Sequence, residues 1–456
     1  MDAIEPLIDY AIGAQGKLLP QRIVELTKNL MFDTLSLMRV GGAAPGCAAI
    51  SACYAKWGGR PEATVLTTGA RLPAPVAAMI NSVTTHALDF DDTHETADVH
   101  AFAVVLPAAM AIAEWTGRVA GRDFLTAIGI GAEVAYRMGE AIEKYRGWHP
   151  TATCGVFGAT FGCGLIAGLD RPTLHNALGI AYSLSAGNWQ AILDGSLTKR
   201  MQPAFAARAA VEATVLAMSG ITGAKRLLEG TFGFYPLYEH GEYDRDALVK
   251  GLGERFEIER VSLKPYPCCR FCHSAPEATL LLAEEFDLRP QDVKRVTAKV
   301  PQEVKDLVGQ PYRPGDSPEV SAQFSIPFCI AASLTHRRLG LQEFQRPIVL
   351  DPDIAELARK VDIVVVSNLD RWGPQEFIFT LNDGRVVSRT VKIMKGHPDH
   401  PLTRVEIMAK SRDSLVFAGL PPKISDDLAR CLDAFEERPD TMASILGVMR
   451  QNGAPQ

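Results

Sequence analysis

Long apolar runs are absent from this 456-residue sequence. The stretch 101–113 and others like it are shorter than the roughly 20 residues that a membrane-spanning helix needs. Basic runs are also missing, the net charge is −6, and the acidic N-terminus lacks the basic segment of a secretory or transit peptide. We therefore expect a cytoplasmic protein that binds neither membranes nor nucleic acid.

Aromatic residues are scarce too, at 7% of the chain, which bears on two metal motifs that the sequence approaches. Asp91-Asp92 with Glu95 matches the diphosphate motif of helical terpenoid synthases, but those enzymes need a second metal motif and an aromatic-lined pocket. His94-Glu95 begins the zinc-protease motif H-E-x-x-H, but Asp98 stands where the second histidine is required. Both motifs are incomplete, so we predict no metal here.

The nine cysteines are an odd number and are scattered, so we predict reduced thiols rather than a disulfide framework. Three lie in KPYPCCRFCHSAPEA (264–278), where Cys269, Cys272 and His273 form C-x-x-C-H, the attachment pattern for a c-type haem. Haem attachment needs an export signal, and zinc needs further ligands such as a second C-x-x-C pair. Neither is found, so we predict neither group.

The length favours two domains, and the sequence pattern changes near residue 259. Before it, apolar residues recur at helical spacing, and Ala and Gly are dense enough to let helices approach closely. After it, strand-like segments alternate with helical ones, and 376–393 is typical of a hairpin that turns at Asn382-Asp383-Gly384. Beyond 401 the helical pattern returns.

We therefore predict a mainly α fold in which a large all-helical domain, 1–258 plus 402–456, carries a smaller α+β lid domain, 259–401, inserted near the C-terminus. The predicted strands are 293–301, 361–367 and the two arms of 376–393. The predicted helices include 20–39, 74–88, 101–113, 121–144, 203–219, 274–286, 321–336, 352–360, 403–411 and 425–448.

The segment 81–101 is the most polar stretch within the helical region. It carries eight acidic or histidine side chains, namely His86, Asp89, Asp91, Asp92, His94, Glu95, Asp98 and His100. Because it lies between two apolar segments predicted as helices, it is a candidate for a loop that lines a cleft. A solvated helix end is the alternative interpretation of such a charge cluster.

Two cationic clusters accompany this segment. Lys199 and Arg200 precede a helix of small residues, and Lys264 and Arg270 lie near two prolines at the predicted domain junction. Together with the polar segment, they suit a substrate that carries several carboxylates. His149 precedes a Gly-rich helical start, where it is either a structural histidine or part of an anion site.

Six blocks occur in order across residues 81–335, and together they resemble the MmgE/PrpD family of 2-methylcitrate dehydratase, cis-aconitate decarboxylase and iminodisuccinate epimerase. The blocks are HALDFDDTHETADVH, GWHPTATCGVFG, DGSLTKRMQPAFAARAAVEA, LEGTFGFY, KPYPCCRFCHSAPEA and SAQFSIPFCIAASL. The resemblance implies a helical domain with an α+β lid and a homodimer. It also implies a small di- or tricarboxylic substrate and no metal or other cofactor.

The resemblance also implies site residues, which match the family blocks position by position: Asp89, Thr93, His100, His149, Lys199 and Lys264. The sequence departs from the family at His100-Ala101-Phe102-Ala103, where many members have His-Pro-Ser-Gly, and at Phe328, where a tyrosine is common. We expect Phe102 to reshape the pocket and Phe328 to remove a hydroxyl from it.

The family's reactions break a bond at the carbon next to a carboxylate, so they need cations for the developing charge and a positioned acid or base. We expect Lys199, Lys264 and Arg270 to bind carboxylates. His100 is the predicted proton-transfer residue, oriented by Asp89.

His149 is predicted as a second acid or base or as a substrate ligand. Thr93, Arg200 and His273 are further predicted substrate contacts, although His273 has the alternative role of capping the helix 274–286.

A 2-methylcitrate dehydratase-like hydro-lyase is the function that the sequence favours. An epimerase or isomerase of a dicarboxylate and a cis-aconitate decarboxylase-like enzyme are the alternatives, because all three reactions make the same demand on the site. A carboxylate-binding homologue without catalysis is a further alternative, against which stands the retention of both histidines and both lysines.

Overall fold

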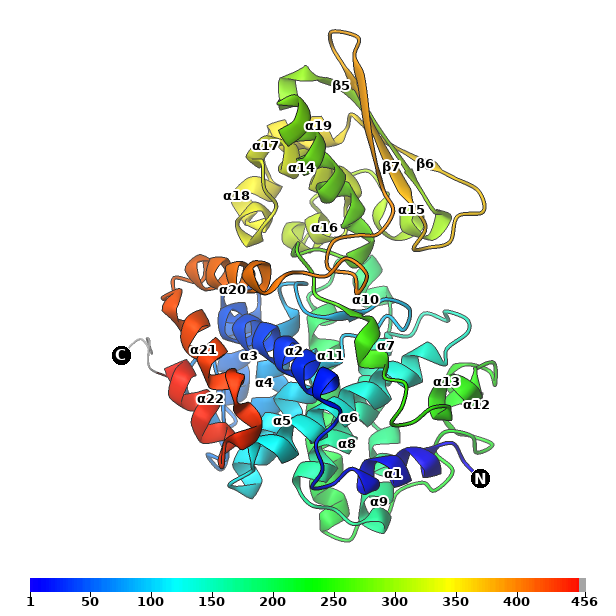
Figure 1. The fold of residues 1–456 in the computed structure, drawn as a ribbon, viewed down its shortest axis with the longest axis vertical. Coiled ribbons are helices and arrows are strands. Elements are labelled where there is room, and N and C mark those ends of the chain that lie inside the picture. Colours follow the sequence, from blue (N-terminus) through cyan, green and yellow to red (C-terminus); the bar gives the residue numbers. More distant parts are fainter. Residues whose placement is uncertain (451–456) are drawn as a thin grey trace.

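The computed structural model describes residues 1–450 of the chain. Figure 1 shows a large helical body with a smaller unit above it, in which helices pack beside a sheet. The chain is mainly helical, as predicted. None of the helices within the described residues is both long and apolar enough to cross a membrane.

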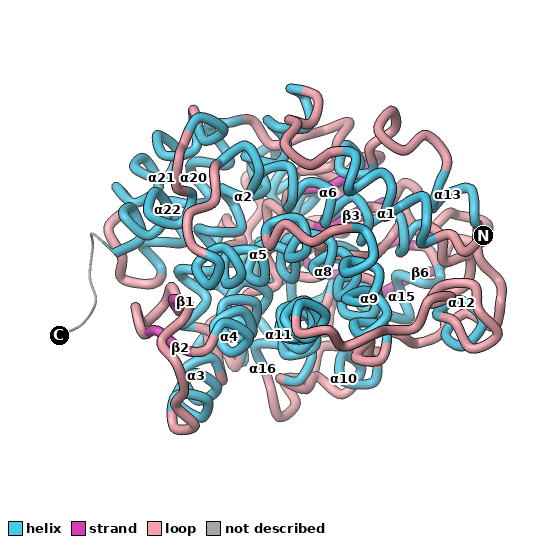
Figure 2. The backbone as a smooth tube through the Cα atoms, turned by 90° about the horizontal axis from the view of Figure 1, so that it is seen from below, coloured by secondary structure: helices cyan, strands magenta, loops and turns pink. Residues whose placement is uncertain are grey.

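The helical body is formed by the first part of the chain and by the last three helices. Its helices are α1 (Ile4–Gly13), α2 (Gln21–Val40), α3 (Cys47–Ala55), α4 (Ala74–His86), α5 (Phe102–Thr116), α6 (Gly121–Glu140), α7 (Pro150–Thr153), α8 (Gly155–Ile166), α9 (Arg171–Tyr182), α10 (Gln190–Leu193), α11 (Thr198–Met218), α12 (Phe234–Tyr238), α13 (Arg245–Val249), α20 (Arg404–Phe417), α21 (Lys423–Asp433) and α22 (Thr441–Arg450). Seen from below, α5, α8 and α11 lie at its centre (Figure 2).

Small residues set the spacing of these helices. A Cβ atom added at Gly158 of α8 would lie 2.3 Å from the carbonyl oxygen of Gly131 in α6, so the two backbones touch. The Gly- and Ala-rich composition therefore lets the helices pack closely, as the sequence predicted.

The smaller unit contains a four-stranded sheet in the order β6-β5-β7-β8. Its strands are β5 (Val293–Val300), β6 (Val361–Val365), β7 (Gln375–Leu381) and β8 (Val386–Val391). β5 pairs in parallel with β6 and antiparallel with β7, and β7 and β8 form the predicted hairpin. The helices are α14 (Ser274–Phe286), α15 (Gln302–Val308), α16 (Pro318–Gln323), α17 (Ile326–His336), α18 (Arg346–Val349) and α19 (Pro352–Ala358).

Two predicted helices are wrong as single elements. The segment 425–448 contains two helices, α21 and α22, with Pro439 between them; proline has no N–H to donate to a helix. The segment 321–336 is divided into α16 and α17, because the Ser325 hydroxyl accepts a hydrogen bond from the Phe328 N–H and so begins a new helix.

Buried apolar side chains form two clusters. One contains residues from the first 258 positions together with residues of the C-terminal segment 407–449 and Leu341 of the smaller unit, and the other contains residues 268–394. The two clusters support the division into 1–258 plus 402–456 and 259–401, which we keep as a proposal.

The short strands β3 (Thr93–His94) and β4 (Val261–Ser262) pair antiparallel and position the site. Thr93 lies opposite Ser262, so the polar segment 81–101 is held beside the chain that leads to Lys264. The two remaining strands, β1 (Ala63–Thr64) and β2 (Arg71–Leu72), form a separate pair.

Candidate active site

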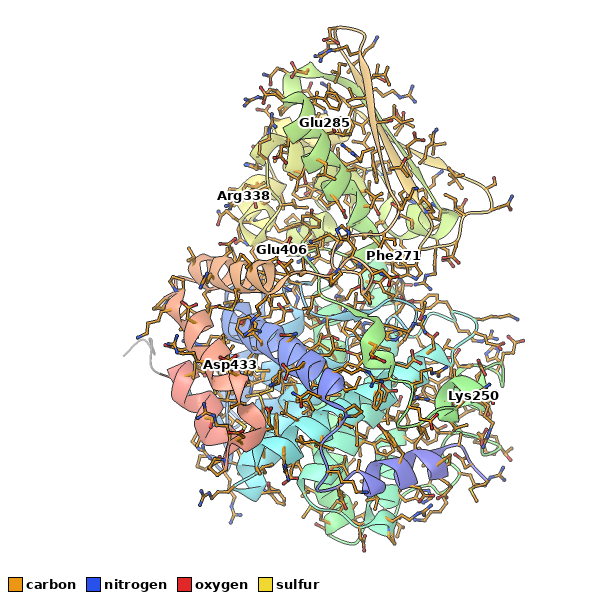
Figure 3. The ribbon with its side chains drawn as sticks, in the orientation of Figure 1. Lys250, Phe271, Glu285, Arg338, Glu406 and Asp433 are labelled. Atoms are coloured by element: carbon orange, nitrogen blue, oxygen red, sulfur yellow. The ribbon has the colours of Figure 1, made fainter. Side chains whose placement is uncertain are left out.

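A small cavity of about 50 Å³ lies where the helical body meets the smaller unit. Phe271, one of its lining residues, stands at this junction in Figure 3. Seven of the nine predicted site residues line the cavity, namely Asp89, Thr93, His100, His149, Lys199, Lys264 and Arg270. The structure therefore brings together residues from four distant sequence blocks.

Asp89 holds two lysines at the cavity. Its backbone is in the left-handed region (φ 52°), a conformation that aspartate tolerates better than most residues, in the turn that follows α4. One carboxylate oxygen lies 2.5 Å from Lys199 Nζ, and the other lies 3.3 Å from Lys264 Nζ. Burial by itself would raise the pKa of Asp89, but the two ammonium groups hold it well below its usual value.

His100 has its Nδ1 atom 2.5 Å from the carbonyl oxygen of Asp92. A carbonyl only accepts hydrogen bonds, so Nδ1 carries the hydrogen and Nε2 keeps its lone pair. Burial lowers the pKa of His100 to about 3, so the imidazole is neutral at neutral pH before a substrate binds. The Asp92 carbonyl, and not Asp89 as predicted, orients this ring, because Asp89 is bonded to the lysines.

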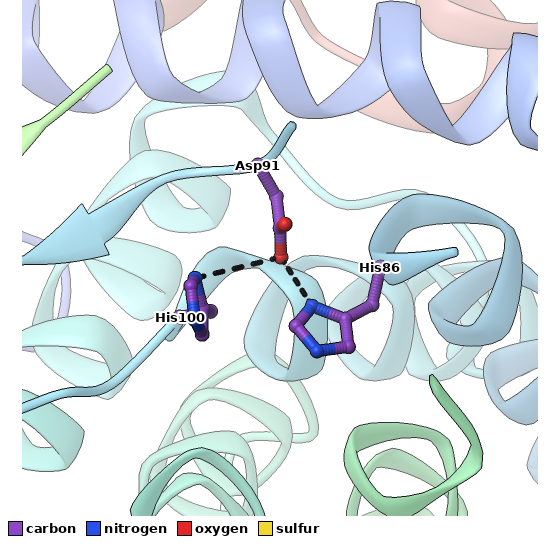
Figure 4. Close-up of side chains that lie close together, drawn as sticks. All are labelled: His86, Asp91 and His100. Carbon is purple, nitrogen blue, oxygen red and sulfur yellow. Dashed lines mark hydrogen bonds and ion pairs between the residues drawn. The ribbon is translucent and has the colours of Figure 1, made fainter. Parts of the chain in front are cut away.

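Asp91 lies next to the Nδ1 atom of His100 and was not among the predicted site residues. Figure 4 shows its carboxylate between two rings, with Oδ2 2.6 Å from His86 Nδ1 and 3.8 Å from His100 Nδ1. Burial would raise the pKa of Asp91, but His86 and His100 lower it. The carboxylate therefore stays ionised beside the Nδ1 edge of His100, where its charge would partly offset that of an imidazolium formed by protonation at Nε2.

The candidate ligand atoms of His86, Asp91 and His100 lie within 4.8 Å of one another, a spacing that suits a metal ion. Hydrogen bonds at these residues already explain the close spacing of their side chains, however. His86 Nδ1 is bonded to Asp91, and His100 Nδ1 donates to the Asp92 carbonyl. In these hydrogen bonds both Nδ1 atoms carry hydrogen, so an ion bound through them would first have to displace that hydrogen.

His149 and Trp189 both line the cavity, and the centroids of their rings lie 6.1 Å apart. Burial lowers the pKa of His149 well below its usual value. Within residues 1–450, neither His149 Nδ1 nor Trp189 Nε1 has a hydrogen-bond partner, although both atoms are buried. Sequence reasoning missed Trp189, because a single tryptophan in a loop carries no signal of its own.

Arg270 lines the cavity, but its guanidinium is committed to the protein. It lies 2.8 Å from Glu95 and donates to the carbonyl oxygen of Lys395 at 2.9 Å. Its predicted contact with a substrate carboxylate stays a prediction.

Arg200 and His273 lie outside the cavity, contrary to prediction. Arg200 donates to the carbonyl oxygen of Pro45 at 2.9 Å. His273 has Nε2 3.2 Å from the Cys268 carbonyl oxygen and makes no side-chain cap to α14, so neither predicted role for it is seen.

The two departures from the family pattern do not reach the pocket. Phe102 and Phe328 are fully buried, each in one of the two apolar clusters, and neither lines the cavity. Phe324 lines it instead. Neither Phe102 nor Phe328 lines the cavity directly, so the effect of both departures on the pocket stays a prediction.

All nine cysteines are free thiols, as predicted. Cys269 lines the cavity, whereas Cys268 and Cys272 are buried beneath it. Among the described residues, the only three-residue group with metal-ligand spacing is the histidine–aspartate cluster, so the C-x-x-C-H segment does not form one.

Comparisons with known proteins agree with this geometry. The MmgE/PrpD N-terminal domain matches residues 5–246, and the MmgE/PrpD C-terminal domain matches residues 266–427. The chain is 27% identical over 421 residues to a cis-aconitate decarboxylase of Aspergillus terreus, covering 86% of this chain and 85% of the relative. It is 28% identical over 411 residues to the human cis-aconitate decarboxylase, covering 86% and 84%.

Proposed function

This chain belongs to the MmgE/PrpD family, and from that premise we propose that it is a lyase that decarboxylates a small tricarboxylate, with cis-aconitate as the first candidate substrate. The observation that carries the proposal is the small cavity that two neutral imidazoles and two lysine ammonium groups line together. The names of relatives that match most of the chain support decarboxylation in particular.

The lysines retain donors for a substrate. An ammonium group has three N–H donors. Lys199 gives one to Asp89, and Lys264 gives two, to the carboxylate and the backbone carbonyl of Asp89. Three donors remain between the two lysines and suit one substrate carboxylate. The single negative charge of Asp89 does not cancel the two positive charges of the lysines.

In the proposed reaction the bond between carbon and one carboxylate breaks, and carbon dioxide leaves. The electron pair stays on the organic fragment and spreads onto a neighbouring carboxylate, which Lys199 and Lys264 stabilise. An imidazolium, at His100 or His149, then gives a proton to the carbon, so one proton is consumed per turnover.

The proton must enter with the substrate, because burial keeps both imidazoles neutral before a substrate binds. A bound tricarboxylate adds negative charge beside the rings and therefore raises their pKa values. Asp91, 3.8 Å from His100 Nδ1, offsets part of the imidazolium charge.

Dehydration, which the sequence favoured, is the second candidate. A specific observation supports it: His100 is neutral and keeps its Nε2 lone pair, which suits a base that removes a proton, with His149 as the acid for the departing hydroxyl. Epimerisation needs the same first step. A homodimer, which the resemblance implies, stays a prediction.

Proton NMR of the purified protein with separate acids tests the proposal. Cis-aconitate should give a dicarboxylate and carbon dioxide, whereas 2-methylcitrate should be unchanged. Lys199→Met should lower kcat by about 10²–10³-fold, as expected for loss of one charge-stabilising donor. The exposed Lys250→Met serves as its matched control and should have no effect. Dehydration of 2-methylcitrate without loss of carbon dioxide from cis-aconitate would replace the proposal by its alternative.

A further inference from the structure

Residues 366–374, which connect β6 to β7, reach from the smaller unit to the rim of the cavity. We call this segment the strap. Its Arg371 Nη2 lies 2.7 Å and 2.5 Å from the two carboxylate oxygens of Asp98, which belongs to the helical body and lines the cavity. One ion pair therefore joins the strap to the opposite side of the site.

The strap also forms a wall of the cavity. The Trp372 ring stacks on Phe271 with centroids 4.6 Å apart and planes 9° apart, and both residues line the cavity. The Arg371 guanidinium lies 5.0 Å and 5.3 Å from the centroids of these two rings. The ion pair and the stacked rings hold the strap in place.

The cavity is too small for a substrate while the strap is in this position. Its volume of about 50 Å³ holds a few water molecules, which need about 10–15 Å³ each. Pockets that bind small organic ligands are typically about 300 Å³ or larger. A wall must therefore move before a tricarboxylate enters.

Of the ion pairs at the cavity, the Arg371–Asp98 pair is the one that costs least free energy to break. Each of its side chains is 26% exposed. The Lys199–Asp89 pair is 9% and 4% exposed, and the Arg270–Glu95 pair is 4% and 7% exposed. Since water solvates both partners of a separated, exposed pair, breaking it costs far less than breaking a buried one.

The strap carries two buried donors that make no hydrogen bond within the described part of the chain, Trp372 Nε1 and Arg371 Nε. Glu303 Oε2 lies 3.7 Å from Arg371 Nε, which is an ion-pair distance but too long for a hydrogen bond. Buried donors without partners are rare because each one costs free energy. An anion in the cavity would supply the missing acceptors.

We propose that Arg371 and Trp372 are substrate-binding residues. Before a substrate binds, Arg371 holds the strap closed on Asp98, and in the complex it exchanges that carboxylate for one of the substrate, while Trp372 Nε1 donates to the same ligand. The inference rests on the proposed function only in requiring a polycarboxylate substrate.

The thiol of Cys269 reports on the opening of the strap, because it lies inside the cavity. Its alkylation by iodoacetamide is followed by mass spectrometry, with the exposed Cys53 as internal reference. Arg371→Ala and Asp98→Asn both break the ion pair, so both should speed alkylation by about two- to fivefold, as for loss of a partly exposed pair. Arg295→Ala is the matched control, because it breaks the exposed Arg295–Asp362 pair of the sheet. It should leave the rate of Cys269 alkylation unchanged.

Protection of Cys269 by cis-aconitate then measures binding without turnover. Arg371→Ala should need about tenfold more anion than wild type, because it loses a charge-assisted contact. Asp98→Asn keeps Arg371 and removes the carboxylate that competes for it. Protection of Cys269 in this variant should therefore need no more cis-aconitate than in wild type. Trp372→Phe keeps the stacking and loses the N–H, so it should weaken protection without speeding alkylation.

Unchanged alkylation in both ion-pair variants would overturn the inference. Equal protection in Arg371→Ala and Asp98→Asn would also overturn it, since Arg371 would then only close the strap. If alkylation and protection follow expectation but NMR detects no turnover, the inference stands and the proposed function fails.

Discussion

Replacing Asp89 by asparagine tests how the site is held together. Asparagine keeps the size of the side chain and also tolerates the left-handed backbone found here, so the change removes mainly the charge. Lys199 and Lys264 would then be buried without the carboxylate that contacts both of them. Breaking a buried pair by removing one partner costs about 3–5 kcal/mol, and we expect the free energy of unfolding to fall by that amount.

Asp287→Asn is the matched control. Asp287 also has a positive φ of 48° and lies within 3.2 Å of two arginines, but its side chain is 75% exposed. Exposed pairs contribute about 0–1 kcal/mol, so this variant should lose at most that much. Chemical denaturation followed by circular dichroism gives both values.

The dependence on pH provides a second check. Because the lysines lower the pKa of Asp89 in the folded protein, its contribution is present above the unfolded value of about 3.9 and is lost as the pH falls below it. The stability difference between wild type and Asp89→Asn should therefore be constant from about pH 5 to 8. Equal losses of unfolding free energy in the Asp89 and Asp287 variants would show that Asp89 does not hold the two lysines in place.

Other predictions concern the histidines and the core. His100→Gln should lower kcat by about 10²–10⁴-fold with little change in the melting temperature, and turnover near the wild-type rate would contradict its role. Binding of cis-aconitate should take up protons near neutral pH, which calorimetry in buffers of different ionisation enthalpy detects; no uptake would contradict a proton donor formed on binding. Phe328→Ala should lower the free energy of unfolding by about 3–5 kcal/mol and leave KM unchanged, because Phe328 lies in the core and not in the cavity. A changed KM would place it at the site after all.

Local patterns in the sequence predicted much of the fold. The hairpin of β7 and β8 follows from alternating residues around Asn382-Asp383-Gly384, and the helical periodicity of 20–39 corresponds to α2. Helix breaks were harder to predict. A hydroxyl such as that of Ser325 begins a new helix through one hydrogen bond, and apolar periodicity does not show this.

The site was predicted in part because its residues lie in recognisable blocks. What the sequence could not show is which charges pair with one another. Arg270 looked available for a substrate, but Glu95 holds it, and Arg200 turns away to a backbone carbonyl. Trp189 and Arg371 reach the site from loops without a motif, so only the folded chain places them there.

Incorporation of solvent deuterium tests whether the protein decarboxylates cis-aconitate with His100 in proton transfer. Wild-type protein and His100→Gln are incubated with cis-aconitate in D₂O, and the products are followed by NMR. Wild type should release carbon dioxide and form a dicarboxylate with one deuterium on carbon per turnover, while His100→Gln should form almost none. No conversion of cis-aconitate by wild type, or wild-type deuterium transfer by His100→Gln, would contradict these expectations.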